Sequence, residues 1–127
     1  MTKPSCPFCP PAPGRIIASD EFAVVMRDSY PVSPDHTLIL PRRHVGSYFD
    51  ASAAERESLL RLLDQAKAVL DAEFHPHGYN IGINDGAAAG QTVPHLHLHL
   101  IPRYAGDSAD PRGGVRWVLP GKAQYWP

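Results

Sequence analysis

The sequence has little of three features, and each shortage excludes a class of protein. No apolar run is long enough to span a bilayer, and the first residues lack the apolar core of a signal peptide. The net charge is only −1, so no global electrostatic field attracts nucleic acid or an anionic membrane. The chain contains only two cysteines, too few for a zinc site made of cysteine alone. We therefore expect a cytoplasmic protein with neither nucleic acid nor a membrane as its partner.

Length and composition are those of a small soluble domain. The 127 residues suffice for one hydrophobic core and leave no room for a second. Hydrophobic residues make up 43% of the chain and charged residues 20%, which is ordinary for a globular protein. The 14 prolines occur in clusters that separate periodic segments. Residues 1–127 are thus expected to form a single domain.

Hydrophobic periodicity predicts five strands and one long helix. Apolar residues indicate strands at 15–18, 21–26, 36–41, 79–84 and 95–100, and 115–120 is compatible with an additional edge strand. Ser52 and Glu55 have the spacing of a capping box, and leucines recur at helical spacing from there to Phe74. The expected fold class is α+β, with a five-stranded, mainly antiparallel sheet and one long helix packed on it.

The most unusual segment is the predicted strand at 95–100, in which histidine and leucine alternate strictly. Successive side chains of a strand point to opposite faces, so the leucines share one face with the core and His95, His97 and His99 line the other. Histidine has modest strand propensity, and a buried ring needs hydrogen-bond partners. Such a row can bind a metal or supply a nucleophile; the alternative is an exposed polar face without chemistry.

The run His-Leu-His-Leu-His-Leu-Ile resembles the signature of the histidine triad (HIT) family, in which histidines alternate with apolar residues. The preceding run from Asn84 to Pro94 is similar to the segment that leads into the triad in that family. The resemblance covers the chain from about Cys6 to Arg103. It implies a HIT-like fold and a nucleotide hydrolase or nucleotidyl transferase that acts at an α-phosphorus.

The resemblance also assigns catalytic roles, which residue spacing alone does not distinguish. HIT enzymes use the middle histidine as the nucleophile, so His97 would attack the α-phosphorus and carry the nucleotidyl group. His99 would stabilise the phosphoryl oxygens or the leaving group. Neutral imidazole suits this chemistry, because its ordinary pKa near 6.5 leaves it mostly unprotonated at neutral pH.

Cys6 and Cys9 form a Cys-Pro-Phe-Cys motif near the N-terminus. A redox motif of this spacing needs a helix that begins at the motif, and the surrounding prolines prevent one. Half of a zinc site and a pair of free thiols remain as interpretations. The resemblance favours a structural zinc site in segment 1–14, because zinc-bearing HIT proteins complete it with a histidine after the Pro-basic-basic motif and the first histidine of the triad. These are His44 and His95 in this chain.

Substrate contacts outside the triad also follow from the resemblance. Asp28 lies at the position whose side chain binds the ribose hydroxyls, although a turn-forming aspartate is the alternative. Gly86 and Gly90 permit positive φ angles, which allow backbone N–H groups to converge on an anion, whereas a plain hairpin loop is the alternative. The resemblance adds contacts from Asn84, Gly90, Gln91 and Thr92, and His36 is expected in the core or behind the site.

The irregular C-terminal tail, 103–127, departs from the better-known branches of the family. Trp117 and Trp126 can stack on a base or pack on a partner subunit. Arg112 and Arg116 are candidates for contacts to distal phosphates or are ordinary surface charges. The base and the leaving group of the substrate are therefore left open.

The preferred function is hydrolysis of a dinucleoside polyphosphate or another adenylyl compound. Cleavage of a nucleoside phosphoramidate is the second choice. A catalytically silent nucleotide-binding protein and a zinc-stabilised interaction module are the non-enzymatic alternatives. A cupin-like metal enzyme is disfavoured because no glutamate ligand follows within the strand. The resemblance implies a homodimer with structural zinc and without an organic cofactor.

Overall fold

The structure is a computed structural model that describes residues 5–127, so the first four residues of the expected zinc segment lie outside the described residues. Five strands and one long helix form the framework. In chain order they are β1 (Ile16–Ser19), β2 (Ala23–Arg27), β3 (Thr37–Pro41), α1 (Ala53–Phe74), β4 (Gly78–Ile83) and β5 (Leu98–Arg103).

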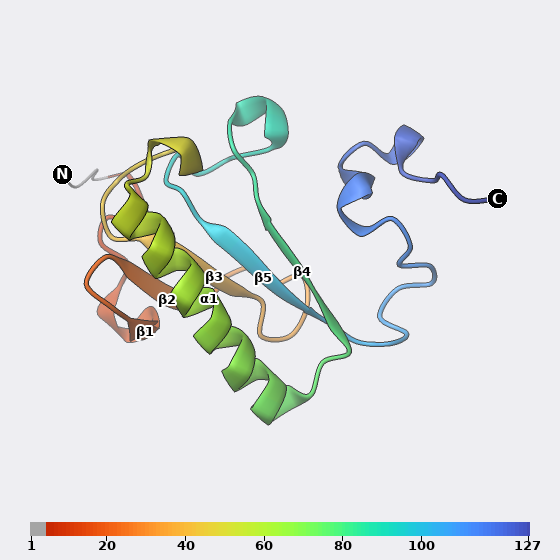
Figure 1. The fold of residues 1–127 in the computed structure, drawn as a ribbon, viewed down its shortest axis with the longest axis horizontal. Coiled ribbons are helices and arrows are strands. Elements are labelled where there is room, and N and C mark those ends of the chain that lie inside the picture. The colour runs from red at the N-terminus through yellow and green to blue at the C-terminus, as the bar shows by residue number, and fades with distance from the viewer. Residues whose placement is uncertain (1–4) are drawn as a thin grey trace.

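The five strands form one sheet in the order β1-β2-β3-β5-β4, and every neighbouring pair is antiparallel. β2 and β3 are buried nearly throughout, which agrees with their apolar residues on both faces. Figure 1 shows α1 lying across one face of this sheet. The predicted α+β architecture is confirmed.

Helix α1 begins and ends where its sequence predicts. The Ser52 side chain accepts the N–H of Glu55, and the Glu55 carboxylate accepts the N–H of Ser52, so the capping box is complete. At the other end His75 adopts a left-handed conformation, with φ of 51°, and stops the helix. Leu59, Leu62 and Leu70 of this helix are buried in the core between α1 and the sheet.

The two faces of the sheet bury different sets of side chains. Leu96, Leu98 and Leu100 belong to the core beneath α1, as the alternation predicts. On the opposite face Phe8 covers a second apolar cluster with side chains from β2 and β3. His99 pairs with Leu38 across the β3–β5 ladder, so it lies on this second face. The histidine row therefore faces away from the helix.

The strand that carries the histidines is shifted from its predicted position at 95–100. β5 begins at Leu98, because the ladders with β3 and β4 start there, and it runs through Pro102 to Arg103. Pro102 is tolerated because β3 pairs only as far as Leu100. Residues 95–97 precede the ladder, and the N–H of Leu96 donates instead to the carbonyl of Val45 at 2.7 Å.

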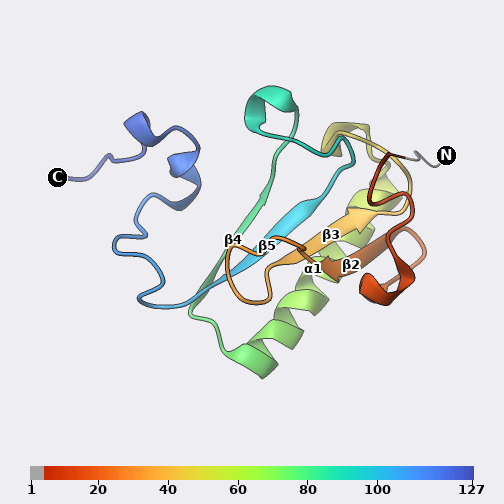
Figure 2. The same ribbon diagram turned by 180° about the vertical axis from the view of Figure 1, so that it is seen from behind.

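The prediction of an edge strand at 115–120 is wrong. This segment forms short 3-10 helices at Gly114–Val118 and Pro120–Lys122. Side chains fold the tail onto itself: the indole of Trp117 donates to the carbonyl of Arg112, and Arg116 donates to the carbonyls of Lys122 and Ala123. Figures 1 and 2 show the tail beyond β4, on the side opposite the N-terminus. No helix in the described part of the chain has the length and apolar character of a membrane span.

Candidate active site

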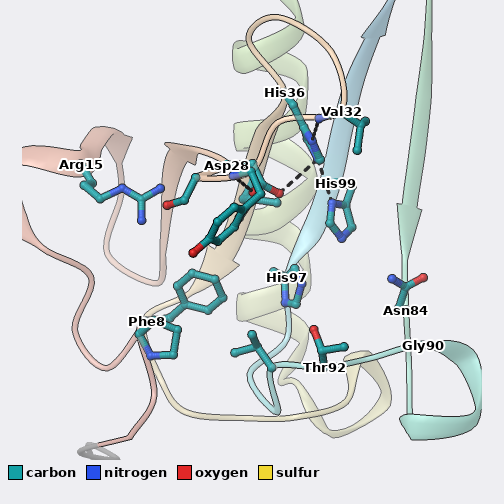
Figure 3. Close-up of a pocket in the computed structure, with 15 residues that line it drawn as sticks. Phe8, Arg15, Asp28, Val32, His36, Asn84, Gly90, Thr92, His97 and His99 are labelled. Atoms are coloured by element: carbon teal, nitrogen blue, oxygen red, sulfur yellow. Dashed lines mark hydrogen bonds and ion pairs between the residues drawn. The ribbon is translucent and has the colours of Figure 1, made fainter.

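A cavity of about 400 Å³ opens on the face of the sheet opposite α1. Figure 3 shows His97 and His99 on its floor, Asp28 and His36 at one side, and Asn84 and Thr92 at the other. Of the predicted catalytic and substrate-binding residues, the structure thus brings all but one together; the lining includes Asp28, Asn84, Gly90, Thr92, His97 and His99.

The proton of the His97 ring is assigned by its hydrogen bond. Nδ1 lies 2.7 Å from the carbonyl oxygen of His95. A carbonyl oxygen only accepts, so Nδ1 carries a proton, and in the neutral form of the ring the lone pair lies on Nε2. Phe8 packs against this ring with centroids 5.5 Å apart and restricts its rotation. These two contacts fix the orientation of the His97 ring.

Asp28, His36 and His99 form a hydrogen-bonded group at the side of the cavity. Nε2 of His36 lies 2.9 Å from Nδ1 of His99 and 3.5 Å from Oδ2 of Asp28. The other Asp28 oxygen accepts the N–H of Tyr30 at 2.8 Å. Asp28 thus forms the turn that the simpler interpretation predicts, and the residue also lines the cavity.

Burial keeps the histidines of this group neutral. Desolvation lowers the pKa of His99 to about 4, with further lowering by His97 and His36, while Asp28 opposes the change. Desolvation also lowers the pKa of His36, again against the effect of Asp28. At neutral pH His99 therefore acts as an uncharged hydrogen-bonding group.

The loop before the histidine row closes the other side of the cavity. Gly86 and Gly90 adopt φ angles of 97° and 94°, a region that favours glycine. Between them Ala87–Ala89 forms one 3-10 turn. The loop therefore uses the conformational freedom that the sequence predicts, and it places Gly90 and Thr92 beside the cavity.

Gln91 is placed differently from its predicted neighbours. Its side-chain oxygen accepts the N–H of Gly86 at 2.8 Å, and its amide nitrogen donates to the carbonyls of Gly46 and Val93 at 2.9 and 3.2 Å. The side chain is outside the cavity lining. In this geometry Gln91 stabilises the loop instead of pointing toward a ligand.

Cys6, Cys9, His44 and His95 form a group whose ligand atoms all lie within 4.8 Å of one another. Cys9 Sγ is 3.0 Å from Nδ1 of His44 and 3.3 Å from Nδ1 of His95, and Cys6 Sγ is 3.5 Å from the same His95 atom. His95 is fully buried, and its Nε2 donates to the carbonyl of Pro41 at 2.8 Å. Nδ1 of His95 is therefore an available lone pair, so the group can hold a tetrahedral metal ion.

A second group of possible ligands, Asp28, His36 and His99, is also compact. The N–H of Val32 donates to Nδ1 of His36 at 3.2 Å, so the proton of the neutral His36 ring lies on Nε2. A protonated Nε2 cannot ligate a cation. This group is accordingly a hydrogen-bonded network.

For several cavity residues the sequence did not predict a position at the site. Phe8, Arg15, Val32 and Leu38 line the cavity, and His36 contacts it from a buried position. Phe8 lies between the two cysteines, so a metal site next to the triad would have indicated its position. The tail residues Arg112, Arg116, Trp117 and Trp126 do not line it; Arg112 stacks on Trp126, with the guanidinium carbon 4.7 Å from the ring centroid.

The HIT domain family model matches residues 10–106 of this chain. An uncharacterised HIT-like protein of Mycoplasma genitalium is 36% identical over 107 residues, which cover 81% of this chain and 76% of the relative. An AP-4-A phosphorylase of Mycobacterium tuberculosis is 32% identical over 75% of this chain and 49% of its own length. A bis(5'-nucleosyl)-tetraphosphatase of Schizosaccharomyces pombe is 32% identical over 79% of this chain and 55% of its own length.

Solved structures show the same similarity. A HIT family protein from Bacillus anthracis superposes with a TM-score of 0.73 at 35% identity, covering 84% of this chain and 78% of the other. A zinc-bound histidine triad family protein from Mycobacterium smegmatis has a TM-score of 0.70 at 34% identity, covering 78% and 72%. The family match, the signature at 95–101 and the shared fold lead to one conclusion: this chain belongs to the histidine triad (HIT) family.

Proposed function

We propose that this protein hydrolyses a dinucleoside polyphosphate or another adenylyl compound at the α-phosphorus, through a nucleotidyl-histidine intermediate on His97. The observation that carries the proposal is the hydrogen bond from His97 Nδ1 to the His95 carbonyl, which leaves the Nε2 lone pair free. Relatives named as a phosphorylase and a tetraphosphatase of dinucleoside polyphosphates support the substrate class.

The reaction takes place in two displacements. Nε2 of His97 attacks the α-phosphorus, a P–N bond forms, and the bond to the leaving group breaks with its electron pair on the departing oxygen. Water then attacks the same phosphorus, the P–N bond breaks, and the water proton is released to solvent. The carbonyl of His95 accepts Nδ1–H throughout and stabilises the positive charge of the nucleotidylated ring.

The surrounding groups bind the substrate. Oδ2 of Asp28, which lies 3.5 Å from Nε2 of His36, would accept hydroxyls of the ribose, and Phe8, Val32 and Leu38 give the cavity an apolar wall for the base. Asn84, Thr92 and the backbone at Gly90 would meet the phosphate oxygens, while Gln91 holds their loop. His99 would donate to a phosphoryl oxygen or to the leaving group.

The variant His97→Asn tests the mechanism. Turnover of a dinucleoside tetraphosphate should fall below detection, because an amide cannot take the nucleotidyl group, while the affinity for AMP should change little. With wild-type protein and an α-labelled substrate, acid-labile label should appear on the protein; His97→Asn should give none. His77→Asn, a change outside the cavity, is the control. Wild-type rates in His97→Asn would refute the mechanism, and faster cleavage of an adenosine phosphoramidate would reassign the leaving group.

We further propose that Cys6, Cys9, His44 and His95 hold one structural zinc ion. Two thiols and two imidazoles are a common zinc donor set, and the separations of 3.0–3.5 Å between their atoms suit ligands around one ion. Zinc would join the N-terminal segment to the histidine row without taking part in bond cleavage. The zinc-bound relative from Mycobacterium smegmatis supports this assignment.

A homodimer is also proposed. Within the described residues β4 has a strand on one side only, and Ile81 on this edge is 46% exposed. An exposed strand edge of this kind can pair with a second copy. Sedimentation equilibrium should give about twice the chain mass of 13.9 kDa, and Ile81→Lys should weaken the association. A wild-type mass equal to that of one chain would exclude the dimer.

A further inference from the structure

His36 is the one buried histidine that neither the proposed zinc site nor the proposed chemistry uses. It lies immediately before β3, is 3% exposed, and stands between Asp28 and His99 (Figure 3). We infer that His36 is a positioning residue: it holds His99 in the tautomer whose Nε2–H faces the substrate. The catalytic part of this inference rests on the proposed function, but the tautomer can be observed without turnover.

The hydrogen bonds of His36 determine which of its ring nitrogens carries the proton. The backbone N–H of Val32 donates to Nδ1 of His36 at 3.2 Å, so this nitrogen must present a lone pair. Burial keeps the ring neutral by lowering its pKa. Its single proton therefore lies on Nε2.

His36 in turn determines which ring nitrogen of His99 carries a proton. Nε2–H of His36 lies 2.9 Å from Nδ1 of His99 and donates to it, while Oδ2 of Asp28, at 3.5 Å, is the more distant acceptor. His99 is also neutral, with a pKa of about 4 because of its burial. Since its Nδ1 accepts, its one proton lies on Nε2, and the ring presents a donor to the cavity.

The consequence is a pair of neighbouring rings with opposite hydrogen-bonding character. The His95 carbonyl leaves a lone pair on Nε2 of His97, whereas the Val32 N–H, acting through His36, leaves a proton on Nε2 of His99. The ring centroids of His97 and His99 are 5.1 Å apart. One ring can attack the phosphorus while the other donates to its oxygen. With the proton on Nδ1, His99 would instead present a lone pair to a phosphate and repel it.

The direct test is histidine tautomer assignment by long-range ¹H–¹⁵N NMR on the full chain. In the wild type His99 should show the Nε2–H tautomer, and His36→Gln should preserve it because the amide keeps a donor near the position of Nε2. In His36→Leu the proton of His99 should move wholly or partly to Nδ1. The signals of His97 show whether that neighbouring ring keeps its own wild-type tautomer in each variant. An unchanged His99 tautomer in folded His36→Leu would overturn the inference.

Kinetics provide the second readout. Loss of one oriented donor costs roughly 10²–10³-fold in kcat, so His36→Leu should lose that factor with little change in KM, and His36→Gln should recover most of it. His77→Leu, which removes another histidine whose Nδ1 accepts a backbone N–H, should have no effect. Equal losses in His36→Gln and His36→Leu would indicate a purely structural role and overturn the inference.

If His36→Leu does not fold, Val32 offers a second route, since its side chain is 72% exposed. Val32→Pro removes the N–H that directs His36, whereas Val32→Ala keeps it. Val32→Pro should alter the His99 tautomer, whereas Val32→Ala should keep it. Because Val32 also lines the cavity, the tautomer and not kcat is the readout for this pair of variants. An unchanged tautomer in folded Val32→Pro would overturn the inference. A protein that shows the expected tautomers but forms no nucleotidyl adduct would disprove the proposed function and leave the positioning role standing. Normal catalysis with Nδ1–H on His99 would disprove the positioning role alone.

Discussion

At the residue scale, three histidines of one motif differ because each meets a different backbone or side-chain group. Pro41 accepts the Nε2 proton of His95 and turns its Nδ1 toward the two thiols. The His95 carbonyl accepts the Nδ1 proton of His97, and His36 donates to Nδ1 of His99. The chemical role of each ring follows from where its single proton is held.

The carboxylate of Asp28 is proposed to bind the ribose. One of its oxygens already accepts the N–H of Tyr30, so the other is left for the ribose. Asp28→Asn should raise KM roughly 10- to 100-fold, because a charged acceptor for the hydroxyls is lost, with a smaller effect on kcat.

The measurement compares ribonucleotide with 2'-deoxyribonucleotide substrates in steady-state kinetics. Wild-type protein should prefer the ribonucleotide, and the variant should lose most of this preference. If Asp28→Asn discriminates between the two sugars as well as the wild type, Asp28 does not bind the ribose.

At the scale of elements, the turn between β1 and β2 is joined to α1 by one carboxylate. Asp20 accepts the N–H groups of Phe22 and Ala23 at 3.0 Å each, the hydroxyl of Ser58, and Arg61 at 3.0 Å. Burial would raise its pKa, but these donors outweigh burial and lower the pKa to about 2. The first hairpin is thereby held against the helix.

Asp20→Asn should lower the free energy of unfolding by about 1–3 kcal/mol at pH 7. The pKa of Asp20 is lower in the folded state than in the unfolded state. Its stabilisation is therefore present above about pH 4 and is lost as the pH falls toward 2. Urea unfolding at several pH values should show the difference between wild type and variant shrinking over this window.

The control is Asp64→Asn, which changes an exposed carboxylate of the same helix. Its unfolding free energy should match that of the wild type at each pH. A constant deficit of Asp20→Asn between pH 4 and 2 would show that the carboxylate charge is not the source of the stability.

At the scale of the whole molecule, the proposed zinc site joins three distant parts of the chain. Cys6 and Cys9 precede the sheet, His44 follows β3, and His95 precedes β5. The same N-terminal segment places Phe8 against His97. Metal binding would therefore stabilise the fold and hold one wall of the cavity at the same time.

Removal of the metal should therefore lower the stability of the whole domain. Purified protein should contain about one zinc per chain by elemental analysis. Chelation that costs about 2 kcal/mol should lower Tm by roughly 5–10 °C in a domain of this size. Cys9→Ser should have a low Tm that zinc does not restore. Metal-replete protein without zinc would remove the proposal.

Local patterns in the sequence were sufficient for the family, the five strands, and the helix from its capping box to His75. They succeed because periodicities of two and 3.6 residues and helix capping depend on near neighbours along the chain. The two-residue alternation likewise placed the leucines in the core and the histidines on the opposite face.

Tertiary contacts decided what near neighbours do not specify. The start of β5 at Leu98 depends on where β3 and β4 end, and the folded tail depends on bonds such as that from Trp117 to Arg112. The tautomer of His99 depends on Val32, through a ring 63 residues away along the chain. The sequence by itself therefore determined which groups are present and on which face they lie. Only the folded structure decided where their protons are, because that depends on partners distant along the chain.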